Sequence, residues 1–236
     1  MELFLSLSLF LICVFGTGKE ATAQKFSKNL DHYIKTIVNG TDQIPAKRKV
    51  VLEQISAYVY QALKADKKAN LLAICTHNSR RSQITQTWIA TAALYYGIEG
   101  VQAFSGGTEA TAFNKNAIAG LERAGFLVQK GPETNPQVHV SVGAQQPKWR
   151  MFSKKFTHEI NPPSGFAGIM VCSDADKACP LVPGAAARFS LPFKDPRHFD
   201  NTSVQDAKYD ETVKQIAQEM FLMMKYVRDK MALDKK

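Results

Sequence analysis

The chain has 236 residues, of which 45% are hydrophobic and 22% are charged. This length and composition suit one ordinary globular domain with additions, and they exclude a disordered or fibrous protein. The formal net charge is +9. Because the lysines and arginines are scattered and no RNA-type aromatic motif accompanies them, the charge does not indicate nucleic-acid binding, but it suits a small anionic substrate.

An apolar run at residues 3–15 is too short to span a bilayer comfortably. Ala21-Thr22-Ala23 follows it, a small-x-small pattern that is typical of a signal-peptide cleavage site. The pattern predicts a signal peptide at residues 1–23, cut before Gln24, and an exported protein without stable membrane insertion, periplasmic if the source is bacterial. An uncleaved membrane anchor is the alternative.

Residues 24–68 predict a charged helical extension ahead of the main domain. Asn39-Gly40 marks a turn, and Pro45 opens a second helix. Apolar residues recur there at helical spacing: Val51, Ile55, Tyr58, Val59 and Ala62. We expect this stripe to pack on the main domain, with a partner-binding surface as the alternative.

From residue 69 onward, short apolar runs alternate with helical segments. Strands are predicted at 71–74, 101–105, 166–172 and 188–191, and helices at 82–96, 114–124 and 204–228. This alternation predicts an α/β domain over residues 69–236, with a parallel sheet wrapped by helices and ligands at the carboxyl ends of the strands. Cys75 and Cys172 lie at two such ends.

Residues 131–164 separate these two cysteines and show no strong periodicity. The segment holds five prolines together with Trp149 and several cations. A stretch of this length is expected to be either a flexible insert or a lid over the site. We expect Trp149 to pack ordinarily rather than to contact substrate.

The octet Cys75-Thr76-His77-Asn78-Ser79-Arg80-Arg81-Ser82 joins a predicted strand to a predicted helix. Such a loop aims several backbone N–H groups at one point, where the positive helix end favours an anion. The same field favours a thiolate at Cys75, which then attacks phosphorus, arsenic or sulfur. Arg81 supplies a planar fork for two oxygens. An inert core cysteine is the simpler alternative, but the surrounding strand, loop and helix favour the catalytic interpretation.

A candidate general acid follows the strand predicted at 188–191. Group transfer from an oxyanion needs an acid that protonates the leaving oxygen. Asp195 is the candidate, because Pro196 fixes the turn in which it stands. Asp-Pro also occurs in plain turns, so the prediction depends on its pairing with Cys75.

Cys172 and Cys179 form the third element. Once Cys13 leaves with the signal peptide, they and Cys75 are three cysteines, an odd number that disulfide stapling alone cannot use. A zinc site would need further Cys or His residues at ligand spacing, so no metal is expected. A structural disulfide and a redox pair that exchanges with Cys75 are both open.

Five segments, in chain order, resemble the motifs of the low-molecular-weight protein tyrosine phosphatase superfamily, and most of all those of its thioredoxin-coupled arsenate reductases. They are the octet, residues 105–109, residues 114–118, residues 172–180 and Asp195-Pro196. The resemblance implies a four-stranded parallel sheet of the flavodoxin-like type. The family usually has glycine where His77 stands, which raises the question of the backbone conformation there.

The resemblance also implies roles for these residues. Cys75 would be the nucleophile, Arg81 and the loop from Thr76 to Ser82 the oxyanion cradle, and Asp195 the general acid. In the reductase branch, Cys172 attacks the sulfur of arsenate-bearing Cys75 and arsenite leaves. Cys179 then closes a Cys172–Cys179 disulfide, which a thioredoxin-like protein reduces; no bound cofactor is implied.

We therefore expect an exported enzyme that reduces arsenate through three cysteines. The alternative is a phosphatase acting on phosphotyrosine or small phosphate monoesters, in which the cysteine pair is structural or protective. A phosphate-binding module without turnover is the third possibility, and the presence of both a nucleophile and an acid speaks against it.

Overall fold

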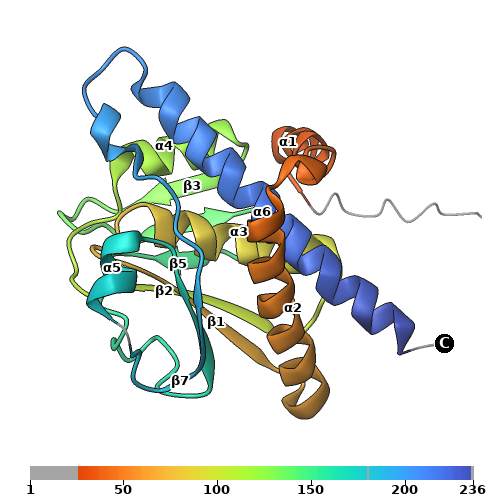
Figure 1. The fold of residues 1–236 in the computed structure, drawn as a ribbon. Helices are drawn as coiled ribbons and strands as arrows, with labels where there is room; N and C mark the ends of the chain where they lie inside the picture. The colour runs from red at the N-terminus through yellow and green to blue at the C-terminus, as the bar shows by residue number, and fades with distance from the viewer. Residues whose placement is uncertain (1–25, 180, 235–236) are drawn as a thin grey trace, which may run out of the picture.

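The computed structural model describes residues 26–179 and 181–234 (Figure 1). The predicted signal peptide lies outside these residues. Within them, no helix combines the length and the apolar character needed to cross a bilayer.

A four-stranded parallel sheet forms the centre of the fold, in the order β2-β1-β6-β7. The strands are β1 (Ala69–Cys75), β2 (Val101–Gly107), β6 (Phe166–Met170) and β7 (Ala185–Ser190). The inner strands β1 and β6 read as continuous apolar runs because both of their faces are covered. The predicted α/β fold with a flavodoxin-like strand order is confirmed.

Helices cover this sheet, and the longest of them, α6, runs diagonally across the molecule (Figure 1). The α-helices are α1 (Lys28–Val38), α2 (Ala46–Asp66), α3 (Arg81–Tyr95), α4 (Lys115–Arg123), α5 (Ser173–Ala178) and α6 (Gln205–Leu233), and the 3₁₀ turns are η1 (Thr41–Gln43) and η2 (Pro196–Phe199). α2 and α3 contact the sheet, while α6 packs against α1, α2, α3 and α4.

The N-terminal helices α1 and α2 belong to the same hydrophobic core as the sheet. Ser27 caps α1 by accepting a hydrogen bond from the Leu30 N–H at 3.2 Å. Ile55 and Val59 of the predicted stripe are fully buried, and Ser56 Oγ donates to the Met223 carbonyl of α6 at 2.8 Å. The stripe packs on the main domain, as expected.

The interpretation of residues 131–164 as a flexible insert or a lid is wrong. With the preceding residues they form a three-stranded antiparallel sheet of β3 (Leu127–Lys130), β4 (Val138–Ser141) and β5 (Trp149–Met151). Val138, Val140 and Met151 are buried in the common core. Strands of three or four residues are too short to show a clear alternation, so the sequence pattern concealed them. Trp149 is half-buried against the core, as expected.

Candidate active site

The octet from Cys75 to Ser82, called the oxyanion loop from here on, lies at the carboxyl edge of the sheet. Cys75 is the last residue of β1, and α3 begins at Arg81. No side chain caps the N-terminus of α3, so its first-turn N–H groups are left for an anion. Gly107, opposite Cys75 on β2, is essential here, because a Cβ would lie 2.6 Å from the Thr76 carbonyl oxygen and 2.7 Å from the Asn78 nitrogen.

Asn78 carries the unusual backbone conformation of the loop. Its φ is +46°, in the left-handed region that asparagine tolerates better than most residues. Its fully buried side chain donates to Ser82 Oγ at 2.9 Å and accepts from the Lys154 N–H at 2.9 Å and from Gln83 Nε2 at 3.2 Å. His77 is not among the described residues with positive φ, so a side chain at this position brings no backbone strain.

The nucleophile candidate is buried and in contact with one hydroxyl group. Cys75 Sγ lies 3.0 Å from Ser82 Oγ, and Cys75 is only 4% exposed. Because Ser82 Oγ already accepts a hydrogen bond from Asn78 Nδ2, its own O–H is free to point at the sulfur. A hydrogen bond donated to the sulfur is what a thiolate nucleophile requires.

Arg81 and Asp195, the predicted cradle arginine and the predicted general acid, are in direct contact. Arg81 Nη2 donates to Asp195 Oδ2 at 2.5 Å, and Arg81 Nη1 donates to the Phe193 carbonyl at 3.0 Å. Arg81 Nε is buried and has no partner among the described residues. Asp195 also caps η2, where its Oδ1 accepts from the Arg197 N–H at 3.1 Å. The guanidinium therefore bridges the oxyanion loop and the acid loop (residues 192–197).

Cys172 lies beside the oxyanion loop. Its Sγ is 3.4 Å from Thr76 Oγ1, since β6 runs next to β1 and ends at the same edge of the sheet. Burial raises the pKa of Cys172, but hydrogen bonds from Thr76 and from the backbone of Ala175, together with the charge of Arg81, more than offset it and leave the pKa below its ordinary value.

Cys179 stands at the other end of α5 from Cys172. It is half-buried, and its carbonyl accepts from Arg188 Nε at 3.1 Å. Cys75, Cys172 and Cys179 are all free thiols. In the part of the chain that the structure describes, no three His, Cys, Asp or Glu residues gather as a metal site would require.

Two predicted loop residues use their side chains to fasten the scaffold. Ser79 Oγ donates to the Ala112 carbonyl at 2.6 Å. Arg80 donates to Tyr209 Oη at 2.9 Å and to Asp200 Oδ2 at 3.2 Å, and thereby joins the loop to α6. These two residues can serve an anion only through their backbone N–H groups. His77 Nε2, at the surface, lies 3.5 Å from Glu109 Oε2.

The sequence analysis missed a buttress behind the oxyanion loop, formed by residues 152–154. Ser153 Oγ donates to the His77 carbonyl at 2.8 Å. Gln83, fully buried in α3, donates through Nε2 to the carbonyls of Asn78 and Phe152 at 3.0 and 2.9 Å. Lys154 is 4% exposed, and burial lowers its pKa to about 8. The only signal in the sequence was that polar Ser153 and Lys154 follow apolar Met151 and Phe152. This pattern does not show which residues of the oxyanion loop they contact.

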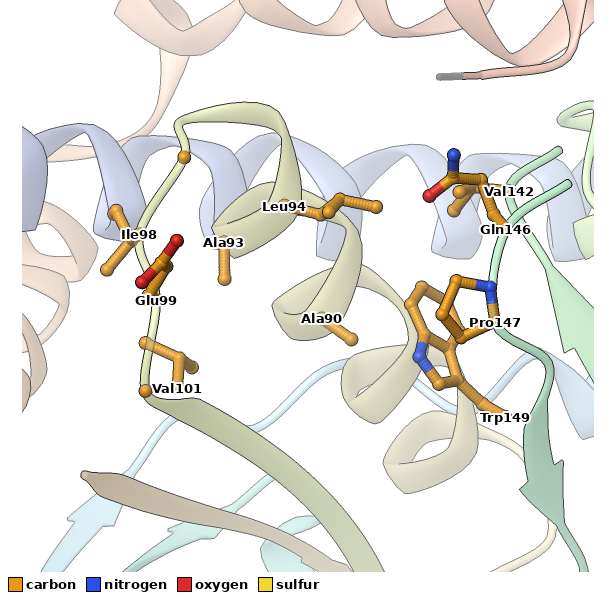
Figure 2. Close-up of a pocket in the computed structure, with 12 residues that line it drawn as sticks. Ala90, Ala93, Leu94, Ile98, Glu99, Val101, Val142, Gln146, Pro147 and Trp149 are labelled. Atoms are coloured by element: carbon orange, nitrogen blue, oxygen red, sulfur yellow. The ribbon is translucent and has the colours of Figure 1, made fainter. Parts of the chain in front are cut away.

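A cavity of about 670 Å³ lies between the oxyanion loop and the acid loop. Its lining includes both loops and the start of α5: Thr76, His77, Arg81, Ser173, Asp174, Phe193, Lys194, Asp195, Arg197, His198 and Phe199. The cavity of about 410 Å³ in Figure 2 lies at the opposite end of the sheet, where β2 begins at Val101, and Glu99 is its only titratable lining residue. Only the first cavity holds the groups that the chemistry needs.

Comparison with known proteins finds two curated relatives of this chain. An arsenate reductase 2 from Staphylococcus epidermidis RP62A is 30% identical over 129 residues, which are 55% of this chain and 79% of the relative, and an arsenate reductase from strain ATCC 12228 matches equally well. The chain belongs to the arsenate reductase family. It is therefore an enzyme of the thiol-dependent kind.

Solved structures with similar folds include both kinds of enzyme. A low-molecular-weight protein tyrosine phosphatase from T. tengcongensis is 13% identical, with a TM-score of 0.48 over 67% of this chain and 99% of that one. A thioredoxin-dependent arsenate reductase from Corynebacterium glutamicum is 16% identical, with a TM-score of 0.36 over 79% of this chain and 92% of that one. No protein-family model matches the chain.

Proposed function

We propose that this enzyme reduces arsenate to arsenite through Cys75, Cys172 and Cys179. The observation that carries the proposal is the contact between Cys172 Sγ and Thr76 Oγ1, because it places a second free thiol beside the loop that holds the nucleophile. A phosphatase needs only one such thiol. The arsenate reductase relatives support the same assignment.

In the first step, the Cys75 thiolate attacks arsenic and one oxygen leaves. Backbone N–H groups of the loop and the Arg81 guanidinium hold the remaining oxygens, and Asp195 protonates the departing oxygen so that it leaves as water. Arg81 Nε, buried and unpartnered in the described part of the chain, supplies a donor for the anion. The product is arsenic(V) bonded to the sulfur of Cys75.

In the second step, the Cys172 thiolate attacks the Cys75 sulfur. A sulfur–sulfur bond forms, and the electron pair of the sulfur–arsenic bond stays on arsenic, which leaves as arsenite. Cys179 then attacks Cys172 and releases the Cys75 thiolate. The lowered pKa of Cys172 increases the thiolate fraction that this step uses.

The Cys172–Cys179 disulfide is then reduced by an external dithiol, which we propose to be a thioredoxin-like protein. Cys179 is the more exposed of the two cysteines, so it offers the sulfur that a partner reaches first. If the chain is exported, as its N-terminus predicts, this reductant has to act in the same compartment.

A phosphatase is the second candidate, favoured by the aromatic rim of the site cavity. Phe199 is 37% exposed at the rim, and Phe193 lies deeper in the same cavity. A cavity of about 670 Å³ has room for an aryl phosphate. In this alternative, Cys75, Arg81 and Asp195 act without the other two cysteines.

One set of assays separates the candidates. The protein and its Cys172→Ser and Cys179→Ser variants are given arsenate with thioredoxin and its reductase, and separately an aryl phosphate. A reductase loses multiple turnover on arsenate in both variants, while any aryl phosphate hydrolysis survives. If arsenate is never reduced and aryl phosphate is hydrolysed by all three proteins, the phosphatase assignment replaces ours.

A further inference from the structure

A residue of the N-terminal extension reaches the loop that carries the general acid. Arg48 lies in the first turn of α2. Its Nη1 donates to the Pro192 carbonyl at 3.0 Å, and its guanidinium lies 4.8 Å from the centre of the Phe193 ring. Both contacts fall on the acid loop, two or three residues before Asp195.

The position of Arg48 is itself fixed from the other side. Its Nε and Nη2 donate to the two carboxylate oxygens of Glu219 on α6, at 2.6 and 2.7 Å. Glu219 is 1% exposed, and a bidentate pair of this kind holds the planar guanidinium in one orientation. α6 crosses α2 and packs against it (Figure 1), so Arg48 is held between two packed helices.

Two arginines, Arg48 and Arg81, therefore hold the acid loop in place from different elements. Arg48 holds the carbonyl of Pro192 and stacks on the ring of Phe193, while Arg81 of the oxyanion loop holds the carbonyl of Phe193 and the carboxylate of Asp195. Phe193 is 4% exposed and its N–H donates to the Val171 carbonyl at 3.1 Å. When an oxyanion recruits Arg81, the contacts of Arg48 and the Phe193–Val171 backbone hydrogen bond still hold the loop.

We propose that Arg48 is a positioning residue for the general acid, and that the N-terminal extension thereby takes part in catalysis without touching substrate. The inference rests on the proposed role of Asp195. The Arg48–Glu219 ion pair joins α2 to α6. The contacts of Arg48 with Pro192 and Phe193 also hold the acid loop, which carries Asp195. Proton transfer depends on the position of Asp195, and a displacement of about 1 Å can lower the rate up to about a hundredfold.

The test compares a variant that releases the loop with one that only loosens the helices. Removing Arg48 alone would leave the buried Glu219 carboxylate with no cation beside it and only the Gln215 amide as a donor, which destabilises the fold, so R48M is combined with E219Q. R48K keeps the charge but loses the fork. The matched control is Ser56→Ala, which removes an α2–α6 hydrogen bond far from the acid loop.

We expect kcat/KM for arsenate to fall about tenfold in R48M/E219Q, less in R48K, and to change less than twofold in S56A. Asp195→Asn alone should lose about a hundredfold, and adding R48M/E219Q to it should cost nothing more, because Arg48 acts through Asp195. Independent, multiplied losses in the combined variant would overturn the proposal, as would equal losses in S56A.

A second measurement does not depend on activity. Hydrogen exchange at the Phe193 amide, followed by NMR on the full chain, should be at least about tenfold faster in R48M/E219Q than in S56A. Equal exchange rates would overturn the proposal. If the unaltered protein fails to reduce arsenate, the proposed function is wrong, and the exchange rates still decide whether Arg48 holds the loop.

Discussion

Asn78 gives the sharpest test of how the oxyanion loop is held. Replacing it by alanine removes the hydrogen bonds to Ser82 Oγ, Gln83 Nε2 and the Lys154 N–H. Each buried bond contributes about 1 kcal/mol net, which gives about 3 kcal/mol. Alanine at a φ of +46° adds about 1 kcal/mol of backbone strain. We expect Asn78→Ala to lower the free energy of unfolding by about 4 kcal/mol.

Glycine at the same position separates the two contributions. Asn78→Gly loses the same hydrogen bonds but has no strain at positive φ, so it should be about 1 kcal/mol more stable than the alanine variant. Guanidinium unfolding measures both values. Asn39→Ala, at an exposed position with φ of −69°, is the control and should change stability by less than about 0.5 kcal/mol. A glycine variant less stable than the alanine variant, or an alanine variant as stable as the control, would refute the reasoning.

Three further predictions concern charge. Thr76→Val removes a hydrogen bond to the Cys172 sulfur, so it should raise the pKa of Cys172. The rate of Cys172 alkylation, measured against pH, should then shift to higher pH, and an unshifted profile would contradict this prediction. Burial lowers the pKa of Lys154 from 10.5 to about 8. The free energy of unfolding should therefore rise between pH 8 and 10.5, by up to about 3 kcal/mol. This rise should disappear in Lys154→Met, and a rise that persists in that variant would contradict the prediction. Asp195→Asn frees Arg81 from its ion pair, so inorganic phosphate should bind at least about tenfold more tightly by calorimetry, whereas unchanged or weaker binding would mean that the pair does not compete with anions.

The sequence predicted the elements that are specified by residues close together in the chain. The octet from Cys75 to Ser82 is contiguous, so the strand before it, the loop and the helix after it could be predicted together. Asp195-Pro196 likewise predicted a turn from two adjacent residues. The parallel sheet followed from apolar runs such as residues 71–74, which are buried on both faces. These elements needed no knowledge of distant partners.

Contacts between distant residues were not predictable in the same way. Lys154 and Asn78 are 76 positions apart, and Arg48 and Glu219 are 171 positions apart. A lone arginine in a charged helix reads as solvated surface, and nothing local shows that a buried carboxylate faces it. The antiparallel strands β3, β4 and β5 were hidden for a different reason, since three or four residues carry too little periodicity to be distinguished from loop.

Helix α6 has a consequence for how the protein is made. Four helices, α1 to α4, pack against it, and it buries Val213, Ile216, Phe221 and Val227 completely. It follows α1 to α4 along the chain, so during synthesis the apolar faces of α2 and α3 stay uncovered until α6 has left the ribosome. A chain that stops early in α6 would therefore leave four helices without their common packing surface.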